Sequence, residues 1–388
     1  MATTDTSLRL LRTIEEVPAT TWDALLGPGS TPFVSWAFLH ALEASGVATP
    51  ATGWTPRHLT LWRGDRLVAA APAWVRNDSR GEFVFDWGWA EAADRAGIPY
   101  YPKLTVAVPF TPAQGERILV APGEDRAALE SAVGEAAIRV AREEGLSSVH
   151  VLFPTAAQAE RLAGVGYARR VGVQFHWRNA GYATYEDFLA RFTSRQRANL
   201  RRERAAAARQ GIEIRTLRGE EVRALDPDLV HRIYLSTVDR MVWGMRYLNR
   251  PFFERLLAEV PGVEWVEARR GGRVIAGALN VASERILYGR YWGALEHHPF
   301  LHFHVCYYHS IEACIARGIQ VFEPGAGGEH KLSRGFEPTL THSAHWIADR
   351  RLDAAVREFL GRETALLEMR VASYRSSTGL RPLDREES

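Results

Sequence analysis

The chain has 388 residues, of which 46% are hydrophobic and 24% charged, so its length predicts about two domains and its composition a soluble globular protein. A formal net charge of +2 gives no global electrostatic case for nucleic-acid binding, and none for DNA in particular. The longest apolar stretches fall far short of the ~20 residues of a membrane-spanning helix, and the first residues are polar. These features predict a cytoplasmic protein with no membrane span.

Strand-like and helix-like segments alternate in the first half of the chain. Residues 57–75 are expected to form two strands joined by a turn at Gly64-Asp65. Residues 125–145 have small apolar residues at helical spacing and end at a glycine, and residues 147–153 follow as a buried strand. A strand pair, a helix and a further strand are typical of one α/β unit.

The same order returns in the second half. Residues 264–281 predict a strand, a Gly-Gly turn and a strand, and residues 284–293 another strand. A helix over 301–317 and a strand over 319–325 complete the set. The recurrence predicts an α/β (α+β) chain of two similar domains, 1–179 and 180–388.

The only two cysteines, Cys306 and Cys314, fall within this predicted helix. Eight residues of helix rise ~12 Å, about twice the usual Cα separation across a disulfide. They are therefore expected to be free core residues, which is consistent with a reducing compartment.

A basic helix is expected between the halves, over residues 192–211. Thr193 or Ser194 can cap its start and Gly211 its end, and Glu203 is its only acid. Arg197, Arg201 and Arg204 would share one face at this spacing. They predict a polyanion-binding face, and a solvated face paired with acids elsewhere is the alternative.

Several segments together resemble one family. In the second half they are residues 289–293 (GRYWG), 301–318, 322–338 (FEPGAGGEHKLSRGFEP) and 343–347. In the first half they are residues 32–46, 81–104, 108–119, 147–154 and 174–179. The chain resembles the FemAB-like group described as peptidoglycan biosynthesis/recognition, which is related to the Fem aminoacyltransferases of the GNAT superfamily.

The resemblance implies two tandem GNAT-like domains, each a mixed, centrally antiparallel sheet flanked by helices. Fem enzymes transfer amino acids from charged tRNA to peptidoglycan-precursor peptides, so charged tRNA becomes an expected partner. Two departures stand out. The family's LHFE is Leu301-His302-Phe303-His304 here, which puts a general-base role at His304 in doubt, and its GAQGEHK is GAGGEHK, which removes an amide at Gly327.

Acyl transfer to an amine needs a base, oxyanion donors and a deprotonated nucleophile. The segment 325–331 supplies glycines that expose backbone N–H groups, followed by the proposed catalytic residues Glu329, His330 and Lys331. His330 titrates near neutrality, Lys331 could neutralise a phosphate or polarise a carbonyl, and Glu329 could orient His330 or accept an ammonium. In the related Fem enzymes a lysine just before a Gly-Phe pair is thought to act at the transfer site, and Lys331 precedes such a pair. The alternative is a glycine-rich structural turn.

Other residues are candidates for binding a peptide or glycopeptide substrate. In the second half they lie at a strand end, on the following helix and after the lysine: Arg290, Tyr291, Trp292, His302, His304, Tyr308 and Arg334. In the first half an aromatic-rich segment contains one acid and one base: Asp86, Trp87, Trp89, Tyr101 and Lys103. Core packing, or packing between domains in the first half, is the alternative for the aromatic residues.

No cofactor is firmly indicated. The one match to the coenzyme A pattern, Arg161 to Gly166, follows a helix and precedes a strand, so its glycines are better explained as a helix stop. Acyl-CoA is therefore less supported as a donor than aminoacyl-tRNA. A zinc site is not expected, because no HExxH or CxxC spacing occurs.

Three functions remain open at this stage. The first is an acyl- or aminoacyltransferase acting on an amine of a cell-wall precursor or similar peptide. The second is a non-catalytic module that recognises peptidoglycan precursors. The third is an acyltransferase for a small secondary metabolite.

Overall fold

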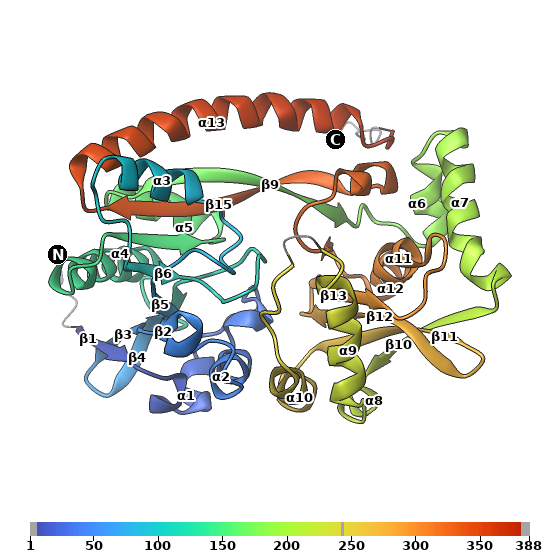
Figure 1. Cartoon of the computed structure of the whole chain (residues 1–388), viewed down its shortest axis with the longest axis horizontal. Coiled ribbons are helices and arrows are strands. Elements are labelled where there is room, and N and C mark those ends of the chain that lie inside the picture. The colour runs from blue at the N-terminus through green and yellow to red at the C-terminus, as the bar shows by residue number, and fades with distance from the viewer. Residues whose placement is uncertain (1–5, 242–243, 382–388) are drawn as a thin grey trace. The chain divides into compact units, whose positions relative to one another are not determined.

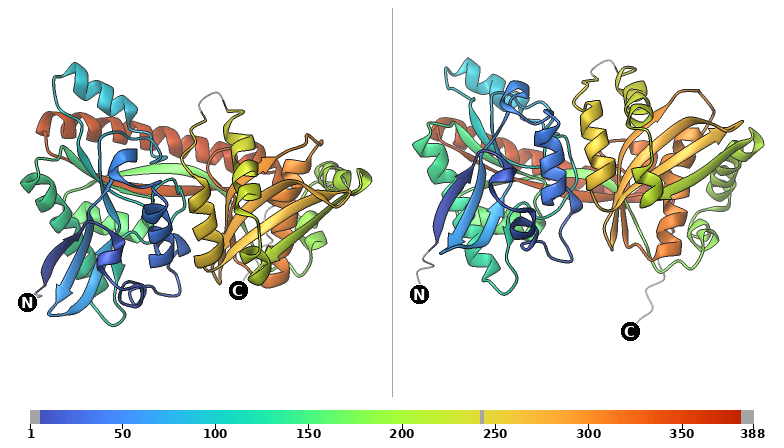
Figure 2. Two further views of the ribbon diagram at one scale, coloured as in Figure 1. Left: turned by 60° about the horizontal axis from the view of Figure 1, so that its bottom comes forward. Right: turned by 90° about the horizontal axis from the view of Figure 1, so that it is seen from below.

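The computed structural model describes residues 6–241 and 244–381 (Figures 1 and 2). The chain divides into two compact units, each assembled from three segments. Unit 1 comprises Met1–Gly172, Tyr247–Arg255 and Leu340–Glu368, and unit 2 comprises Val173–Arg246, Leu256–Thr339 and Met369–Ser388. Four of the boundaries fall inside β9 (Ala168–Arg178), α10 (Arg250–Glu259), β15 (Glu337–Ile347) and α13 (Arg350–Ser376), and the fifth, between Arg246 and Tyr247, lies before α10. The division into domains 1–179 and 180–388 stays a prediction, because compactness does not test independent folding.

Unit 1 contains two sheets. Its strands are β1 (Ser7–Leu11), β2 (Trp54–Pro56), β3 (His58–Arg63), β4 (Arg66–Ala71), β5 (Ala73–Arg76), β6 (Lys103–Val106), β7 (Leu119–Val120) and β8 (Ser148–Leu152). One sheet has the antiparallel order β1-β3-β4-β7. The other runs β15-β8-β6-β5-β2 and is antiparallel except for the parallel pair β6–β8. The predicted hairpin over 57–75 is confirmed as β3 and β4, with β5 as an additional strand.

Helices cover the sheets of unit 1. They are η1 (Ile14–Glu16), α1 (Ala19–Asp23), η2 (Pro32–Val34), α2 (Trp36–Ala44), η3 (Pro50–Thr52), α3 (Trp87–Arg95), α4 (Arg126–Glu143) and α5 (Ala156–Gly164). The Asp125 side chain accepts from Ala128 N and caps α4, and Gly145 follows the helix at φ +67°. Leu129, Val133 and Val140 of α4 pack on β3, β4, β6 and β8. The predicted helix over 125–145 and the strand after it are confirmed.

Unit 2 is built on one twisted sheet of order β10-β11-β12-β13-β14-β9. Its further strands are β10 (Ile212–Arg218), β11 (Val263–Arg270), β12 (Arg273–Ala282), β13 (Ile286–Ala294) and β14 (Val321–Glu323). Only β13 and β14 pair in parallel. Gly271 and Gly272 both have positive φ, which the tight turn between β11 and β12 requires. The predicted hairpin over 264–281 is therefore confirmed.

The helices of unit 2 pack on both faces of this sheet. They are α6 (Tyr185–Ala190), α7 (Ser194–Arg209), α8 (Glu220–Arg223), α9 (Pro227–Val238), α11 (Leu301–Phe303), the π-helical turn η4 (His304–Tyr308), α12 (His309–Arg317) and the 3₁₀ helix η5 (Glu329–Arg334). The predicted helix over 301–317 thus has a π-helical turn in its middle. The Thr193 side chain caps α7 by accepting from Gln196 N, as predicted, and Thr184 with Asp187 forms a capping box at the start of α6.

Strands β13 and β14 separate after a short pairing. Their parallel register covers only Ile286–Tyr288 and Val321–Glu323, yet β13 continues to Ala294. The chain leaves β14 at Pro324 and reaches η5 through glycines, and a Cβ on Gly289 would lie 3.2 Å from Pro324 Cα. The turn that carries Glu329, His330 and Lys331 therefore begins where the two strands part.

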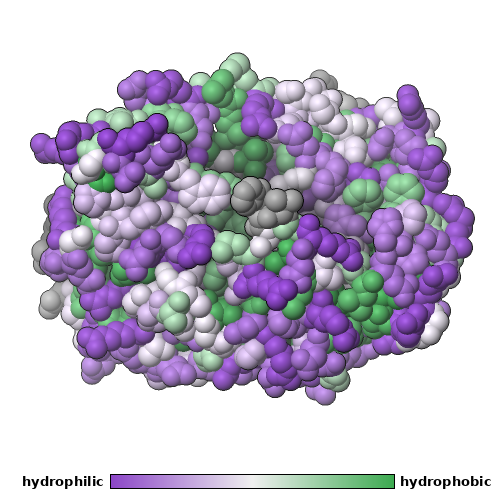
Figure 3. Space-filling model, in the orientation of Figure 1, coloured by the Kyte–Doolittle hydropathy of each residue, from purple (hydrophilic) through white to green (hydrophobic). Residues whose placement is uncertain are grey.

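On the face shown in Figure 3, hydrophobic residues form separate groups among hydrophilic ones. Among the helices within 6–241 and 244–381, none combines the length and the apolar character that crossing a bilayer requires.

Candidate active site

Lys331 lies almost entirely inside unit 2. Its side chain, in the 3₁₀ helix after β14, is 3% exposed, and Nζ donates a 2.7 Å hydrogen bond to the carbonyl of Gly325. No carboxylate of the described chain lies within 4.0 Å of this amine. Burial lowers the pKa of Lys331 to about 8, because desolvation penalises the ammonium form. A substantial fraction of neutral amine is therefore present close to physiological pH.

The neighbouring His330 is exposed. Its Nε2 lies 3.0 Å from Tyr307 Oη. Partial desolvation lowers the pKa of His330, and the positive charges of Lys331 and Arg334 lower it further. The imidazole is therefore neutral at pH 7. If Nε2–H donates to Tyr307, Nδ1 is left as the proton acceptor.

His302 extends this arrangement into an aromatic group. The centroid of its ring lies 5.1 Å from that of Trp292, 5.3 Å from Tyr307 and 6.2 Å from His330. Burial lowers the pKa of His302 to about 4, with smaller contributions from His330 and Lys331. The structure thus brings together three residues that the sequence had suggested, Trp292, His302 and His330, with Tyr307 between them.

Strand alternation separates Tyr291 from Trp292. The Tyr291 ring packs 5.5 Å from Tyr234 of α9, whereas Trp292 faces His302 of α11 on the other side of the sheet. Arg290 is the extra residue of a β-bulge, and its guanidinium lies 5.5 Å from the Tyr291 ring. Only Trp292 of the three consecutive candidates therefore joins the group around His330.

Glu329 and His304 point elsewhere. The exposed Glu329 carboxylate accepts a 2.6 Å hydrogen bond from Tyr374 Oη, so it does not orient His330 in the structure. Burial lowers the pKa of His304 to about 4, and among the described residues its buried Nδ1 has no hydrogen-bond partner. Its ring lies 6.3 Å from Tyr308, on the side that faces Arg204 of α7.

Arg334 and Tyr308 link the site to helix α7. Both are buried, and both donate to the carboxylate of Glu203 on α7. The Arg334 guanidinium lies 3.5 Å above the ring of Phe303. Substrate binding by Arg334 and Tyr308 stays a prediction, and in the structure the polar groups of both side chains are engaged by Glu203 and by each other.

The first-half candidates lie in unit 1, within a buried charge network. Lys103 is 0% exposed and donates to Ser79 Oγ at 2.7 Å, Glu82 Oε2 at 2.8 Å and Asp86 Oδ2 at 2.6 Å. These three bonds use all the donors of its ammonium, so none is left for a phosphate. Burial raises the pKa of the Asp86 carboxyl, but the charge and hydrogen bond of Lys103, together with His150 and Ser79, outweigh it and hold this pKa well below its usual range.

The aromatic residues beside this network differ in their exposure to solvent. Tyr101 Oη lies 2.8 Å from Ser79 Oγ, and Trp89 is buried against His345. Trp87 is 58% exposed and contacts the equally exposed Phe85 at 5.1 Å between ring centroids. Only Trp87 of the first-half candidates therefore presents its aromatic side chain largely to solvent.

Two of the three arginines predicted to bind a polyanion are paired with acids. Arg201 contacts Glu186, Arg204 contacts Glu312, and Arg197 lies 3.5 Å from Ser194 Oγ. A different stripe is exposed, namely Arg195, Arg202 and Arg209. No acid within the described ranges lies in ion-pair distance of these three, and their spacing of seven residues places them along one side of α7.

The lysine content of the sequence is a further signal of the site. The chain contains two lysines, Lys103 and Lys331, against 46 arginines, and both lysines are buried. The positive charges of the surface are arginines in this chain. The two lysines therefore indicate positions where a compact or titratable amine is needed instead of a guanidinium group. Tyr307 and Glu203, which complete the site, were not predicted to take part in it.

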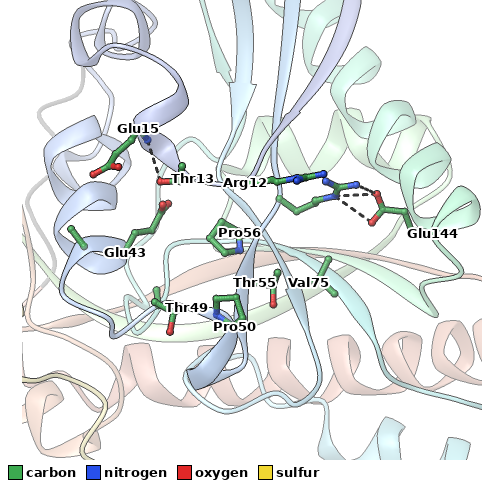
Figure 4. Close-up of a pocket in the computed structure, with 13 residues that line it drawn as sticks. Arg12, Thr13, Glu15, Glu43, Thr49, Pro50, Thr55, Pro56, Val75 and Glu144 are labelled. Atoms are coloured by element: carbon green, nitrogen blue, oxygen red, sulfur yellow. Dashed lines mark hydrogen bonds and ion pairs between the residues drawn. The ribbon is translucent and has the colours of Figure 1, made fainter.

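A separate hollow of about 620 Å³ lies in unit 1 (Figure 4). Glu144, which pairs with Arg57, stands on one side, and Glu15 and Glu43 on the other. Its lining residues include no lysine, histidine or cysteine, and none of the residues predicted to form the site. No cluster of three or more His, Cys, Asp or Glu side chains in the described parts of the chain is arranged to hold a metal ion.

Two solved structures share the fold at low identity. The crystal structure of FemX has 11% identity and a TM-score of 0.55, over 88% of this chain and 98% of that chain. L-PGS from Bacillus licheniformis has 10% identity and a TM-score of 0.50, over 83% and 95%. A tandem GNAT protein from the clavulanic acid biosynthesis pathway follows with 12% identity over 89% and 99%, at a TM-score of 0.47. The predicted fold, mixed α/β with sheets flanked by helices, is confirmed. No curated protein matches the chain.

A family model covers nearly the whole sequence. It matches residues 13–381 and is described as FemAB-like, peptidoglycan biosynthesis/recognition. The residues that suggested this resemblance, including GRYWG on β13 and GEHK at η5, lie within the match. The chain belongs to the FemAB-like family.

Proposed function

We propose that the chain is an acyl- or aminoacyltransferase that acylates an amine of a peptide or cell-wall-precursor-like substrate. The observation that carries the proposal is Lys331, a buried amine without a carboxylate partner in the described chain, at the point where β13 and β14 separate. Membership of a family concerned with peptidoglycan, and a fold shared with FemX, support the class of reaction.

The chemistry assigns a separate role to each group. The acceptor amine attacks the donor's ester carbonyl, a C–N bond forms, the C–O bond breaks, and the alcohol leaves with a proton. Neutral His330 takes the proton of the attacking amine on Nδ1 and returns it to the leaving oxygen. Lys331, as ammonium, donates to the carbonyl oxygen as negative charge develops there, and exchanges the Gly325 carbonyl for the substrate. His302 lies beside His330 and Trp292 beside His302, and we assign both to binding the acceptor.

We propose aminoacyl-tRNA as the donor, in preference to acyl-CoA. The exposed stripe Arg195, Arg202 and Arg209 extends for ~21 Å along α7 and lacks acid partners within the described residues. Three unpaired guanidinium groups at this spacing suit a phosphate backbone better than a single pyrophosphate. FemX and L-PGS share the fold, but at about a tenth of identical residues they do not decide the donor.

A donor panel tests the proposal. The purified chain would be incubated with radiolabelled aminoacyl-tRNAs, or with acyl-CoAs, and with peptide and muropeptide-precursor acceptors. We expect label in the acceptor from at least one charged tRNA. Tight binding of a precursor without turnover under any donor would instead support the non-catalytic recognition module. Transfer to small amines alone would support the secondary-metabolite alternative.

A further inference from the structure

Helix α7 touches the 3₁₀ helix η5 through two side chains. Gln196 Nε2 donates a 2.6 Å hydrogen bond to the carbonyl of Ser333. Glu203 accepts from Arg334 NH2 at 3.1 Å on Oε1 and 2.9 Å on Oε2. Seven residues are close to two helical turns, so Gln196 and Glu203 lie on the same side of α7.

The remaining donors of Arg334 fix the turn itself. NH1 donates at 2.8 Å to the carbonyl of His330, which belongs to the peptide joining His330 to Lys331. Nε donates to Tyr308 Oη at 3.0 Å. The guanidinium is 9% exposed and Glu203 13%, so this ion pair is largely shielded from solvent. Arg334 therefore links the carboxylate of Glu203 directly to the backbone between the two proposed catalytic residues.

Glu203 is the single acid of α7, among six arginines, and the structure turns it inward. Loss of its charge would leave the buried Arg334 without a counterion, which is unfavourable, so Arg334 would move toward solvent and release the His330 carbonyl. We propose that Glu203 is a positioning residue that acts through Arg334 on the His330–Lys331 turn. The effect on turnover rests on the proposed function, whereas the effect on the turn does not.

The two lysines allow a test without any substrate. Competitive labelling with acetic anhydride across a pH series, read by mass spectrometry, reports the pH at which each amine becomes reactive. An added small amine of known pKa serves as the reactive reference, and Lys103, enclosed in the separate network of unit 1, is expected to stay unreactive in every variant. The titratable groups around Lys331 are Cys306 and His302 of the helix before β14, His176 of β9, and His330.

In the wild type we expect Lys331 to become reactive with a midpoint near pH 8. In Glu203→Gln the loosened turn exposes the amine, so the midpoint rises by about one pH unit or more, toward an ordinary lysine. Glu203→Asp keeps the charge and stays close to wild type. Glu186→Gln is the matched control, because it removes the acid that pairs with Arg201 outside the turn, and its profile stays at the wild-type midpoint.

A folded Glu203→Gln protein with a wild-type Lys331 profile would overturn the proposal. If Glu203→Gln does not fold, Gln196→Ala takes its place, since it removes only the second contact with the turn. A rise of the Lys331 midpoint in Gln196→Ala supports positioning by α7, and an unchanged midpoint in Gln196→Ala contradicts it.

Kinetic measurements distinguish a failure of the positioning role of Glu203 from a failure of the proposed function. With an active donor, we expect Glu203→Gln to lower kcat about ten-fold at unchanged KM for the acceptor, and Glu203→Gln/Arg334→Gln to be no slower than the slower single variant. Additive losses would contradict action through Arg334. If no donor is turned over by the wild type, the proposed function fails while the labelling result still decides the role of Glu203.

Discussion

The two lysines show how one side-chain type serves two purposes in the same chain. Lys103 is enclosed by two carboxylates and a hydroxyl, whereas Lys331 has a single backbone carbonyl for a partner. Removing an ammonium that has buried counterions leaves those carboxylates unpaired, which destabilises the folded chain. A buried ammonium without counterions itself lowers the stability of the folded chain. Opposite effects on stability are therefore expected when each lysine is replaced by methionine.

Replacing Lys331 by methionine is expected to raise the free energy of unfolding by about 1 to 3 kcal/mol at pH 7. The pKa of Lys331 is about 8 in the folded chain and near 10.5 in the unfolded chain. Between these values the unfolded chain binds a proton that the folded chain lacks, so wild-type stability increases with pH across this window. At pH 7, which lies below both pKa values, the folded chain carries the full free-energy penalty of a buried, protonated Lys331. Urea unfolding of both proteins at pH 7 and pH 10 measures the difference, and a less stable Lys331→Met at pH 7 would contradict the assigned burial.

Replacing Lys103 by methionine has the opposite sign. The carboxylates of Glu82 and Asp86 lose the ammonium that they share, and both are buried. We expect a loss of about 3 to 5 kcal/mol in the free energy of unfolding at pH 7, measured by the same urea titration. Wild-type stability in this variant would mean that the network is not closed around Lys103.

At the scale of elements, the 3₁₀ helix that bears Lys331 ends at Gly335. This residue has φ +84°, and a Cβ there would lie 2.7 Å from Phe188 and 2.8 Å from Phe192. Gly335→Ala is therefore expected to lower stability by about 2 to 4 kcal/mol, through left-handed strain and overpacking. Thermal unfolding monitored by circular dichroism checks this. Gly327→Ala is the control for backbone strain without overpacking, because Gly327 has φ +73° and no atom lies within 4 Å of a Cβ built there.

Helix α7 carries two sets of three arginines, one exposed without acid partners and one partly paired with acids. Replacing Arg195, Arg202 and Arg209 by glutamine is expected to weaken tRNA binding at least ten-fold, and to reduce the slope of log affinity against log salt by about two to three. Replacing Arg197, Arg201 and Arg204 should change that slope less, because two of them are neutralised by Glu186 and Glu312. Filter binding over a salt series compares the variants. Equal slopes in both would show that the exposed stripe is not the contact.

At the scale of the whole molecule, periodicity and turn residues predicted the elements well. The Gly64-Asp65 and Gly271-Gly272 turns, the α7 cap at Thr193 and the helix stop at Gly318 all act locally, so a single sequence is enough to find them. The recurrence of strand and helix order indicated the mixed α/β fold. The interleaving of three segments in each compact unit depends on long-range packing, and no local pattern signals it.

The candidate site was harder to predict for the same reason. Residue types alone identify the segment around His330 and Lys331 as a candidate site. They do not identify Tyr307 and Glu203, which other helices bring into contact with this segment. Strand alternation could have shown that Tyr291 and Trp292 point to opposite faces. The inward turn of Lys103 depends on Glu82 and Asp86 folding back over it, which spacing along the chain does not reveal.

The central claim is that Lys331 serves acyl transfer at the end of β14. Single-turnover transfer from a charged tRNA to a peptide amine, with saturating wild type or Lys331→Met whose folding has been verified, tests it most directly. We predict that Lys331→Met loses at least about a hundred-fold in rate, as removal of one oxyanion donor does in other acyl-transfer sites, while donor binding is kept. Transfer by Lys331→Met at the wild-type rate would contradict the assignment.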